Sequence, residues 1–127
     1  QMPIWCWCQW RGERRRRPDL RVGGHLPRGT PGVLLELNLS PDRILRSDFE
    51  LWHYVLNGWY LPASRADERA FHADPDPRRI ERSWNRIFDL QGHSRRYTAA
   101  RAERSIQGVI WELRPADVVQ STPFVAR

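Results

Sequence analysis

The chain of 127 residues contains no lysine, so its 21 strongly basic side chains are all arginines. This absence excludes a phosphate-binding loop built on lysine and a catalytic lysine Schiff base. Cysteine is scarce as well, since Cys6 and Cys8 are the only two. At this spacing on a strand both thiols leave the same face, which excludes a disulfide framework and favours a reducing cytoplasm. No Cys/His spacing matches a zinc pattern, so we expect no metal.

Long apolar runs are also absent. No stretch approaches the length of a bilayer-spanning helix, and no leucine-rich run follows a basic start, so we expect no membrane contact and no secretory signal. The hydrophobic fraction of 40% with seven Trp is nevertheless enough to bury a core. We therefore expect one cytoplasmic domain over residues 1–127.

Positive charge is concentrated near the start of the chain. The net charge is +6, and residues 11–21 hold six Arg against Glu13 and Asp19, a local excess of +4. Such a segment indicates a patch for a polyanion. The absence of lysine also fits a codon bias toward arginine, which would explain the same residues without a ligand.

Apolar periodicity predicts strands over 3–9, 32–39 and 105–113, with a long Arg/Gly/Pro-rich loop over 11–31. The tail after Pro115 could add a last short strand, and residues 42–46 a short edge strand or a turn. Strands and helices alternate without a strict βαβ rhythm, which favours the α+β class and a mostly antiparallel sheet.

Helix-start signals define the remaining elements. Ser47 with Glu50 predicts a capped helix over 47–57. Ser64 predicts a short helix over 65–72, and Asp76 before Pro77 a helix over 77–90. We expect the two main helices, 47–57 and 77–90, to cover one face of the sheet. The shared core is expected to contain Trp52, Trp84 and Trp111.

Four strings in this order resemble a bacterial family: "PIWCWCQWRGERRRRPDLR", "SDFELWHYVLNGWYLP", "SWNRIFDL" and "SIQGVIWEL". The family is catalogued as domain-of-unknown-function family 3841. Its members begin with a further strand and helix that have no counterpart here, so the chain looks like the C-terminal two-thirds of the family. The resemblance implies a folded domain and no particular activity.

The candidate ligand-binding residues lie in the first string, where tryptophans directly precede the arginines. Indoles can stack on bases while guanidiniums neutralise phosphates. The alternative is that the tryptophans are core residues and the arginines keep a loop solvated. The candidates are Trp5, Trp7, Gln9, Trp10, Arg14, Arg15, Arg16, Arg17, Asp19 and Arg21. We expect a binding module for nucleic acid or a nucleotide-bearing ligand, without bond chemistry, and an acidic protein surface could use the same patch.

Secondary candidates lie elsewhere in the chain. His53 has Asn57 one turn later and Glu50 one turn earlier, and a His–carboxylate pair there could do acid–base work. Arg78, Arg82 and Arg86 share one arc of the predicted helix 77–90 and could lie along a phosphate backbone, although exposed charge is usually only solvated.

An enzymatic alternative comes from the last predicted strand. Gln107 and Glu112 there faintly resemble the terminal strand of ADP-ribosyltransferase-type folds, which implies an NAD-using enzyme of the kind related to toxins or defence. Under this hypothesis NAD is the cofactor, and otherwise we expect none. Likeness of fold alone does not fix function.

Overall fold

The computed structural model describes residues 1–14, 17–92 and 95–127. The chain divides into two compact units, which are described separately. Unit 1 comprises residues 1–5, 17–45 and 109–127, and unit 2 comprises residues 6–16 and 46–108. The single domain over 1–127 stays a prediction.

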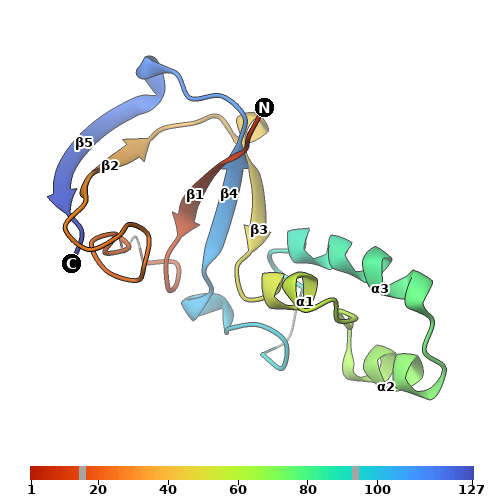
Figure 1. Cartoon of the computed structure of the whole chain (residues 1–127). Coiled ribbons are helices and arrows are strands. Elements are labelled where there is room, and N and C mark those ends of the chain that lie inside the picture. The colour runs from red at the N-terminus through yellow and green to blue at the C-terminus, as the bar shows by residue number, and fades with distance from the viewer. Residues whose placement is uncertain (15–16, 93–94) are drawn as a thin grey trace. The chain divides into compact units, whose positions relative to one another are not determined.

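The fold is α+β, as predicted, with five strands in two antiparallel sheets and three α-helices in the described residues (Figure 1). The strands are β1 Ile4–Gln9, β2 Pro31–Leu37, β3 Leu45–Asp48, β4 Ile106–Ile110 and β5 Val118–Val125. The α-helices are α1 Trp52–Leu56, α2 Arg65–Ala73 and α3 Pro77–Ser83. Short 3-10 helices are η1 Pro41–Arg43, η2 Trp84–Phe88, η3 Arg101–Glu103 and η4 Pro115–Asp117. No helix in the described ranges has the length and apolar character needed to cross a bilayer.

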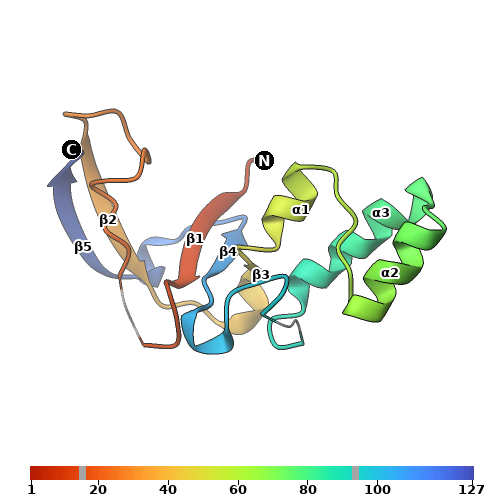
Figure 2. The same cartoon turned by 90° about the horizontal axis from the view of Figure 1, so that it is seen from below.

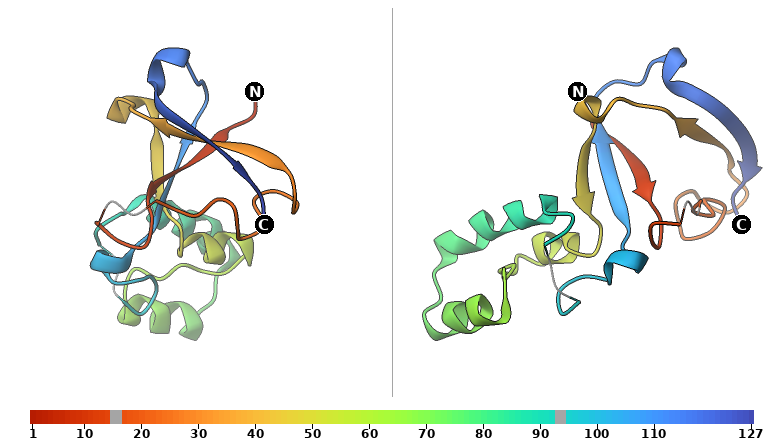
Figure 3. Two further views of the ribbon diagram at one scale, coloured as in Figure 1. Left: turned by 90° about the vertical axis from the view of Figure 1, so that its left-hand side faces the viewer. Right: turned by 180° about the vertical axis from the view of Figure 1, so that it is seen from behind.

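The predicted single sheet is instead two sheets. Segment 32–39 does not join the other two predicted strands, because β2 pairs with the C-terminal strand β5. The remaining sheet has the order β1-β4-β3. Figures 1 and 3 show β2 and β5, which form a two-stranded ribbon in unit 1.

Unit 1 is built on the ribbon of β2 and β5. The register runs from Pro31 opposite Val125 to Glu36 opposite Gln120, and an irregularity then shifts it. Next to the ribbon, Arg43 binds Asp117 through both guanidinium nitrogens, with Nη2 2.8 Å from Oδ2. This ion pair joins η1 to η4, the two short helices that flank the far end of the ribbon.

In unit 2 the chain turns from β3 into α1 at Asp48. The Asp48 carboxylate accepts the backbone N–H groups of Glu50 at 2.9 Å and Leu51 at 3.2 Å. These are the bonds that a capping Asp makes to the backbone ahead of it, but residues 49–51 form a turn before the helix starts. The predicted helix 47–57 is therefore wrong in its first turn, since the helix begins at Trp52. The Ser47 hydroxyl does not cap a helix but accepts the Trp52 indole N–H at 2.7 Å.

The other two helix starts are confirmed. Ser64 accepts the Asp67 N–H and Asp76 accepts the Arg78 N–H, with Pro77 in the first turn. The predicted helix 77–90 is α-helical only to Ser83 and continues as 3-10 helix to Phe88.

The core of unit 2 is formed by the helices and their connections. Leu51, Leu61, Ile87 and Tyr97 are buried there, and Trp52, Tyr54, Val55 and Trp84 pack against them. Figures 2 and 3 show the three helices gathered at one end of this unit. The cluster contains no strand residue, so the expected packing of Trp84 against a sheet face is not observed. Trp111 does not belong to a core, since it follows the end of β4 and is 55% exposed.

Candidate polyanion-binding surface

The candidate surface in unit 2 begins at the turn that follows β1. The Arg11 N–H donates to the Ser105 hydroxyl at 2.9 Å, and the Gly12 N–H to the Arg104 carbonyl at 3.0 Å. That carbonyl also accepts the Gln9 side-chain amide at 2.8 Å. Gly12 is buried with φ of 120°, and a Cβ there would lie 2.0 Å from the Ala102 carbonyl oxygen. Only glycine fits this position.

A buried ion pair supports the residues that anchor this turn. Arg104 is 3% exposed, and its Nε lies 3.3 Å from Oδ2 of Asp48, which is fully buried. The Asp48 carboxylate also accepts the Thr98 hydroxyl at 2.8 Å. Phe49, next to Asp48, donates its N–H to the Ser105 carbonyl at 3.0 Å. The residues that anchor the turn are therefore themselves fixed in the interior of unit 2.

Aromatic rings line the same turn. Trp7 contacts Trp10 edge-on at 4.7 Å between ring centroids, and Phe49 at 5.0 Å. Both tryptophans are half-buried. The Arg11 guanidinium lies over the Trp10 ring, 5.1 Å from its centroid. This contact places a cation and an indole on one surface, which is the combination that the sequence suggested.

Arg11 itself is in an unusual backbone conformation. Its φ is 50°, and it is the only described residue other than glycine with a positive φ. Left-handed backbone of this kind is unfavourable for a side chain with a Cβ. Residues held in it often belong to functional sites.

The remaining arginines of the candidate set have different environments. Arg14 is exposed, and the neighbouring Glu13 is paired with Arg101 at 3.0 Å. Arg15 and Arg16 lie outside the described residues. In unit 1, Arg17 is paired with Glu36 at 2.9 Å. Because Arg21 is paired as well, Arg14 is the one arginine of the three described candidates for which no ion pair is found.

Arg21 is bound by Asp19 through both oxygens, at 2.8 and 2.9 Å. The hydrogen bond from Arg21 lowers the pKa of Asp19 to about 2. Trp5, also in unit 1, is 49% exposed. The candidate residues are therefore divided between the two units, and the arrangement within unit 2 carries the argument below.

The family match includes candidate residues from both units. The family model described as "Domain of unknown function (DUF3841)" matches residues 1–76. The chain belongs to this family. The match includes every candidate residue of the first string. Arg104 and Ser105, which anchor the turn after β1, lie beyond it.

The extent of the resemblance needs correction. We expected similarity through residue 113, as the C-terminal two-thirds of the family, whereas the DUF3841 match covers the N-terminal part of this chain. Neither the curated proteins nor the solved structures that were compared give a match. The family description assigns no activity, so function has to be argued from geometry.

Several predicted site residues of the DUF3841 chain have structural roles. The Gln9 side-chain amide donates to the Arg104 carbonyl and so helps to hold the turn. His53 Nδ1 lies 2.8 Å from the Glu50 backbone carbonyl and 4.0 Å from its carboxylate, and Asn57 donates to the His53 carbonyl at 2.7 Å. These contacts are local, and because the His53–Glu50 pair lies at the limit of ion-pair distance, its acid–base role stays a prediction.

The predicted basic arc on residues 77–90 is also interrupted. Arg78 is bound by Asp76, and Arg82 is exposed. Arg86 points inward and donates to the Leu61 carbonyl at 2.6 Å. The reason is the change to a 3-10 helix at Trp84, which alters the angle between successive side chains.

The residues of the NAD hypothesis lie on or near β4. Gln107 is half-buried on the strand, and Glu112 is exposed after it with its carboxylate bound by Arg114 at 2.9 Å. Nothing in the described residues favours this alternative, which stays a prediction.

Both cysteine thiols have raised pKa values. Burial raises the pKa of Cys6, and it raises that of Cys8 to about 11, with the charge of Cys6 adding to the effect. Both thiols are therefore protonated under ordinary conditions. Within the described ranges, no group of three His, Cys, Asp or Glu side chains is placed to hold a metal ion.

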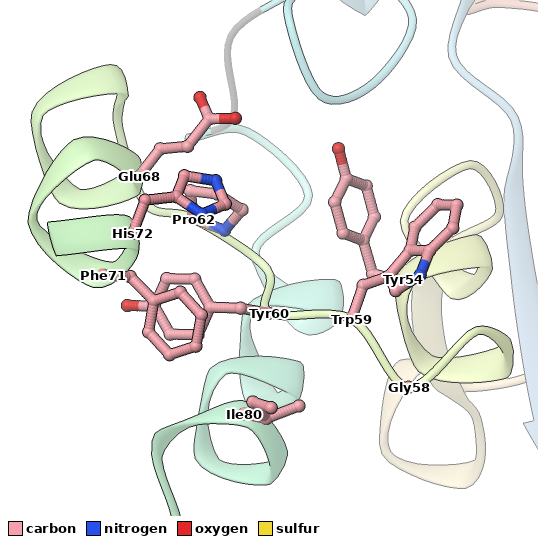
Figure 4. A pocket seen from close by; sticks show the side chains of 9 residues that line it. All are labelled: Tyr54, Gly58, Trp59, Tyr60, Pro62, Glu68, Phe71, His72 and Ile80. Atoms are coloured by element: carbon pink, nitrogen blue, oxygen red, sulfur yellow. The ribbon is translucent and has the colours of Figure 1, made fainter. Parts of the chain in front are cut away.

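Sequence reasoning missed a pocket in unit 2, lined by α1, α2, the segment that connects them and Ile80 of α3 (Figure 4). The signal that could have indicated it is the density of aromatic residues over 52–60. It also missed Arg11, which was counted in the local charge but not among the candidate ligands.

Proposed function

We propose that this DUF3841 chain binds a polyanion, single-stranded nucleic acid in particular, through the surface of Trp10, Arg11 and Arg14. The observation that carries the proposal is the Arg11 guanidinium stacked on Trp10, in a turn anchored by Arg104 and Ser105. The stack joins an electrostatic contact for a phosphate with an aromatic face for a base.

The anchored turn supports binding because little order has to be created when a ligand arrives. The backbone of Arg11 and Gly12 is held by two hydrogen bonds to buried residues. Preorganised groups lose less conformational entropy on association than mobile ones.

Arg17 and Arg21 would contribute only after exchanging partners. Their carboxylates, Glu36 and Asp19, belong to ion pairs at least partly open to water. Such pairs contribute little to stability. A phosphate could therefore replace either carboxylate, but these arginines belong to unit 1 and the proposed surface in unit 2 does not depend on them.

The experiment is a titration of a fluorescein-labelled thymidine oligonucleotide, followed by anisotropy at several salt concentrations. Arg11→Gln should weaken binding and reduce the slope of log K against log salt by about 0.7, the value for one phosphate contact on a single strand. Trp10→Ala should cost about 1–3 kcal/mol of stacking and leave the slope unchanged. Arg82→Gln removes the same charge from an exposed position on α3 and should match wild type.

The outcomes separate the proposals. If Arg11→Gln and Arg82→Gln weaken binding equally, net charge alone attracts the oligonucleotide and the surface has no special role. If Arg11→Gln weakens binding while Trp10→Ala has no effect, stacking is absent, and the result favours the acidic protein surface as ligand.

A further inference from the structure

The pocket in unit 2 is separate from the Trp10–Arg11 stack and has a volume of about 490 Å³. It is lined by Tyr54, Gly58, Trp59, Tyr60, Pro62, Glu68, Phe71, His72 and Ile80. Figure 4 shows the Tyr60 and Phe71 rings on one side and the Tyr54 and Trp59 rings on the other. A pocket with aromatic walls and few polar groups is the usual form of a small-molecule site.

The first aromatic wall is rigid. The Tyr60 and Phe71 rings stack with centroids 3.9 Å apart and an interplanar angle of 3°. The Tyr60 hydroxyl donates to the Asp67 carboxylate at 2.8 Å, and Arg79 donates to that hydroxyl at 3.2 Å. The orientation of Tyr60 is thus fixed without a ligand.

The opposite wall presents an open indole. Trp59 is 56% exposed and meets Tyr54 edge-on at 6.1 Å. Its backbone is held by the Trp84 indole N–H, which donates to the Trp59 carbonyl at 2.8 Å. A large exposed aromatic ring on a fixed backbone is suited to stack against a planar ring.

Glu68 is the acidic group of the pocket. Its Oε2 accepts Arg96 Nε and the Tyr97 hydroxyl, each at 2.9 Å. A carboxylate has about four acceptor positions, and these bonds use two. Because Arg96 already balances the charge of Glu68, the pocket offers hydrogen-bond acceptors without an unpaired negative charge, which disfavours a simple cation as ligand.

Helix α2 carries Glu68, and the helix face with Glu68 also has basic side chains. Arg65, Glu68, Arg69 and His72 follow the i, i+3, i+4, i+7 spacing that places side chains on one helix face. Arg65 and Arg69 are exposed, and no carboxylate of the described residues is paired with them. A ligand in the pocket would therefore have guanidiniums near it for an anionic group.

We propose that this pocket binds a mononucleotide, with its base between the aromatic walls and its phosphate near Arg65 and Arg69. Guanine is the best match, because its two adjacent N–H donors suit the acceptor positions of one carboxylate, here Glu68. This site lies on different residues from the proposed polyanion surface and does not depend on it.

The experiment is calorimetric titration of the whole chain with guanosine monophosphate, and with uridine monophosphate, inorganic phosphate and choline as comparisons. Guanosine monophosphate should bind about tenfold tighter than any of the three, as expected when stacking and donor pairing are combined. Trp59→Ala and Glu68→Gln should each weaken it by about tenfold. Trp59→Phe keeps a ring and should retain most of the affinity.

Arg11→Gln is the matched control, because it should leave the affinity for guanosine monophosphate unchanged even if it abolishes oligonucleotide binding. Thermal melting of each variant checks that it is folded. The proposal is overturned if no nucleotide binds the folded wild-type chain, or if phosphate or choline binds as tightly as guanosine monophosphate.

Discussion

At the scale of single residues, Arg11 combines an unfavourable backbone with a useful side chain. Its left-handed φ of 50° follows from the two hydrogen bonds that hold the turn to Arg104 and Ser105. Its guanidinium contributes a stacked positive charge at Trp10. Selection for stability alone would favour glycine at such a position.

We therefore predict that Arg11→Gly separates stability from binding. The relief of backbone strain at position 11 should outweigh the extra conformational entropy that glycine loses on folding. The free energy of unfolding should therefore rise by about 0.5–1 kcal/mol. Oligonucleotide affinity should fall at the same time. Urea unfolding and anisotropy on the same sample measure both quantities, and a variant that loses stability would show that Arg11 is not strained.

Asp48 is the residue on which the interior of unit 2 depends most. It is fully buried and bonded to Arg104, Thr98 and two backbone N–H groups. Removing one partner of a buried ion pair leaves an uncompensated charge, so Asp48→Ala should cost about 3–5 kcal/mol. Urea unfolding provides the measurement. Asp74→Ala, at an exposed position, should change stability by less than about 0.5 kcal/mol, and similar losses for the two variants would contradict this role.

At the scale of elements, the sequence was informative where a local rule decides the structure. Ser64 and Asp76 cap their helices because each can reach a nearby backbone N–H without help from distant residues. The same rule failed at Ser47. There Asp48, fixed by Thr98 and Arg104 from a distant segment, binds the backbone N–H groups in place of Ser47, and the helix begins only at Trp52.

The candidate site shows the same limit. The sequence suggested tryptophans acting together with Arg14 to Arg17, which stays a prediction, and the structure shows a contact between Trp10 and Arg11, which was not among the candidates. It could not predict that Gln9 bonds to Arg104 or that Arg17 pairs with Glu36, because these partners are distant in the sequence. The pocket was missed for a related reason, since rings from α1, α2 and their connection meet only in the folded chain.

The ribbon of unit 1 provides a prediction about pH. The bonds from Arg43 lower the pKa of Asp117 to about 2. A carboxyl group whose pKa is lowered on folding contributes stability that is complete above its unfolded value of about 3.9 and is lost as the pH falls toward about 2. The free energy of unfolding of the wild type should therefore decrease between about pH 4 and about pH 2.

Asp117→Asn cannot titrate and should show a smaller decrease over this range, from a lower starting stability at neutral pH. Asp74→Asn should follow the wild-type curve. Urea unfolding at several pH values makes the comparison, and an unchanged pH dependence in Asp117→Asn would mean that the Arg43–Asp117 pair does not stabilise the ribbon.

At the scale of the whole molecule, the net charge of +6 is distributed very unevenly once ion pairs are considered. Many arginines are matched with carboxylates of the same chain, such as Arg43 with Asp117 and Arg104 with Asp48. The excess therefore depends on exposed arginines such as Arg11 and Arg14. We infer that position, more than total charge, determines where a polyanion binds this DUF3841 chain.

The most direct test is the ¹H–¹⁵N spectrum of the indole groups, because each of the seven Trp contributes one signal. On addition of the thymidine oligonucleotide, the account predicts that the Trp10 signal shifts. The Trp84 indole, which is bonded to the Trp59 carbonyl, should not shift. Binding of the oligonucleotide with no change at Trp10 would contradict a surface built on the Trp10–Arg11 stack.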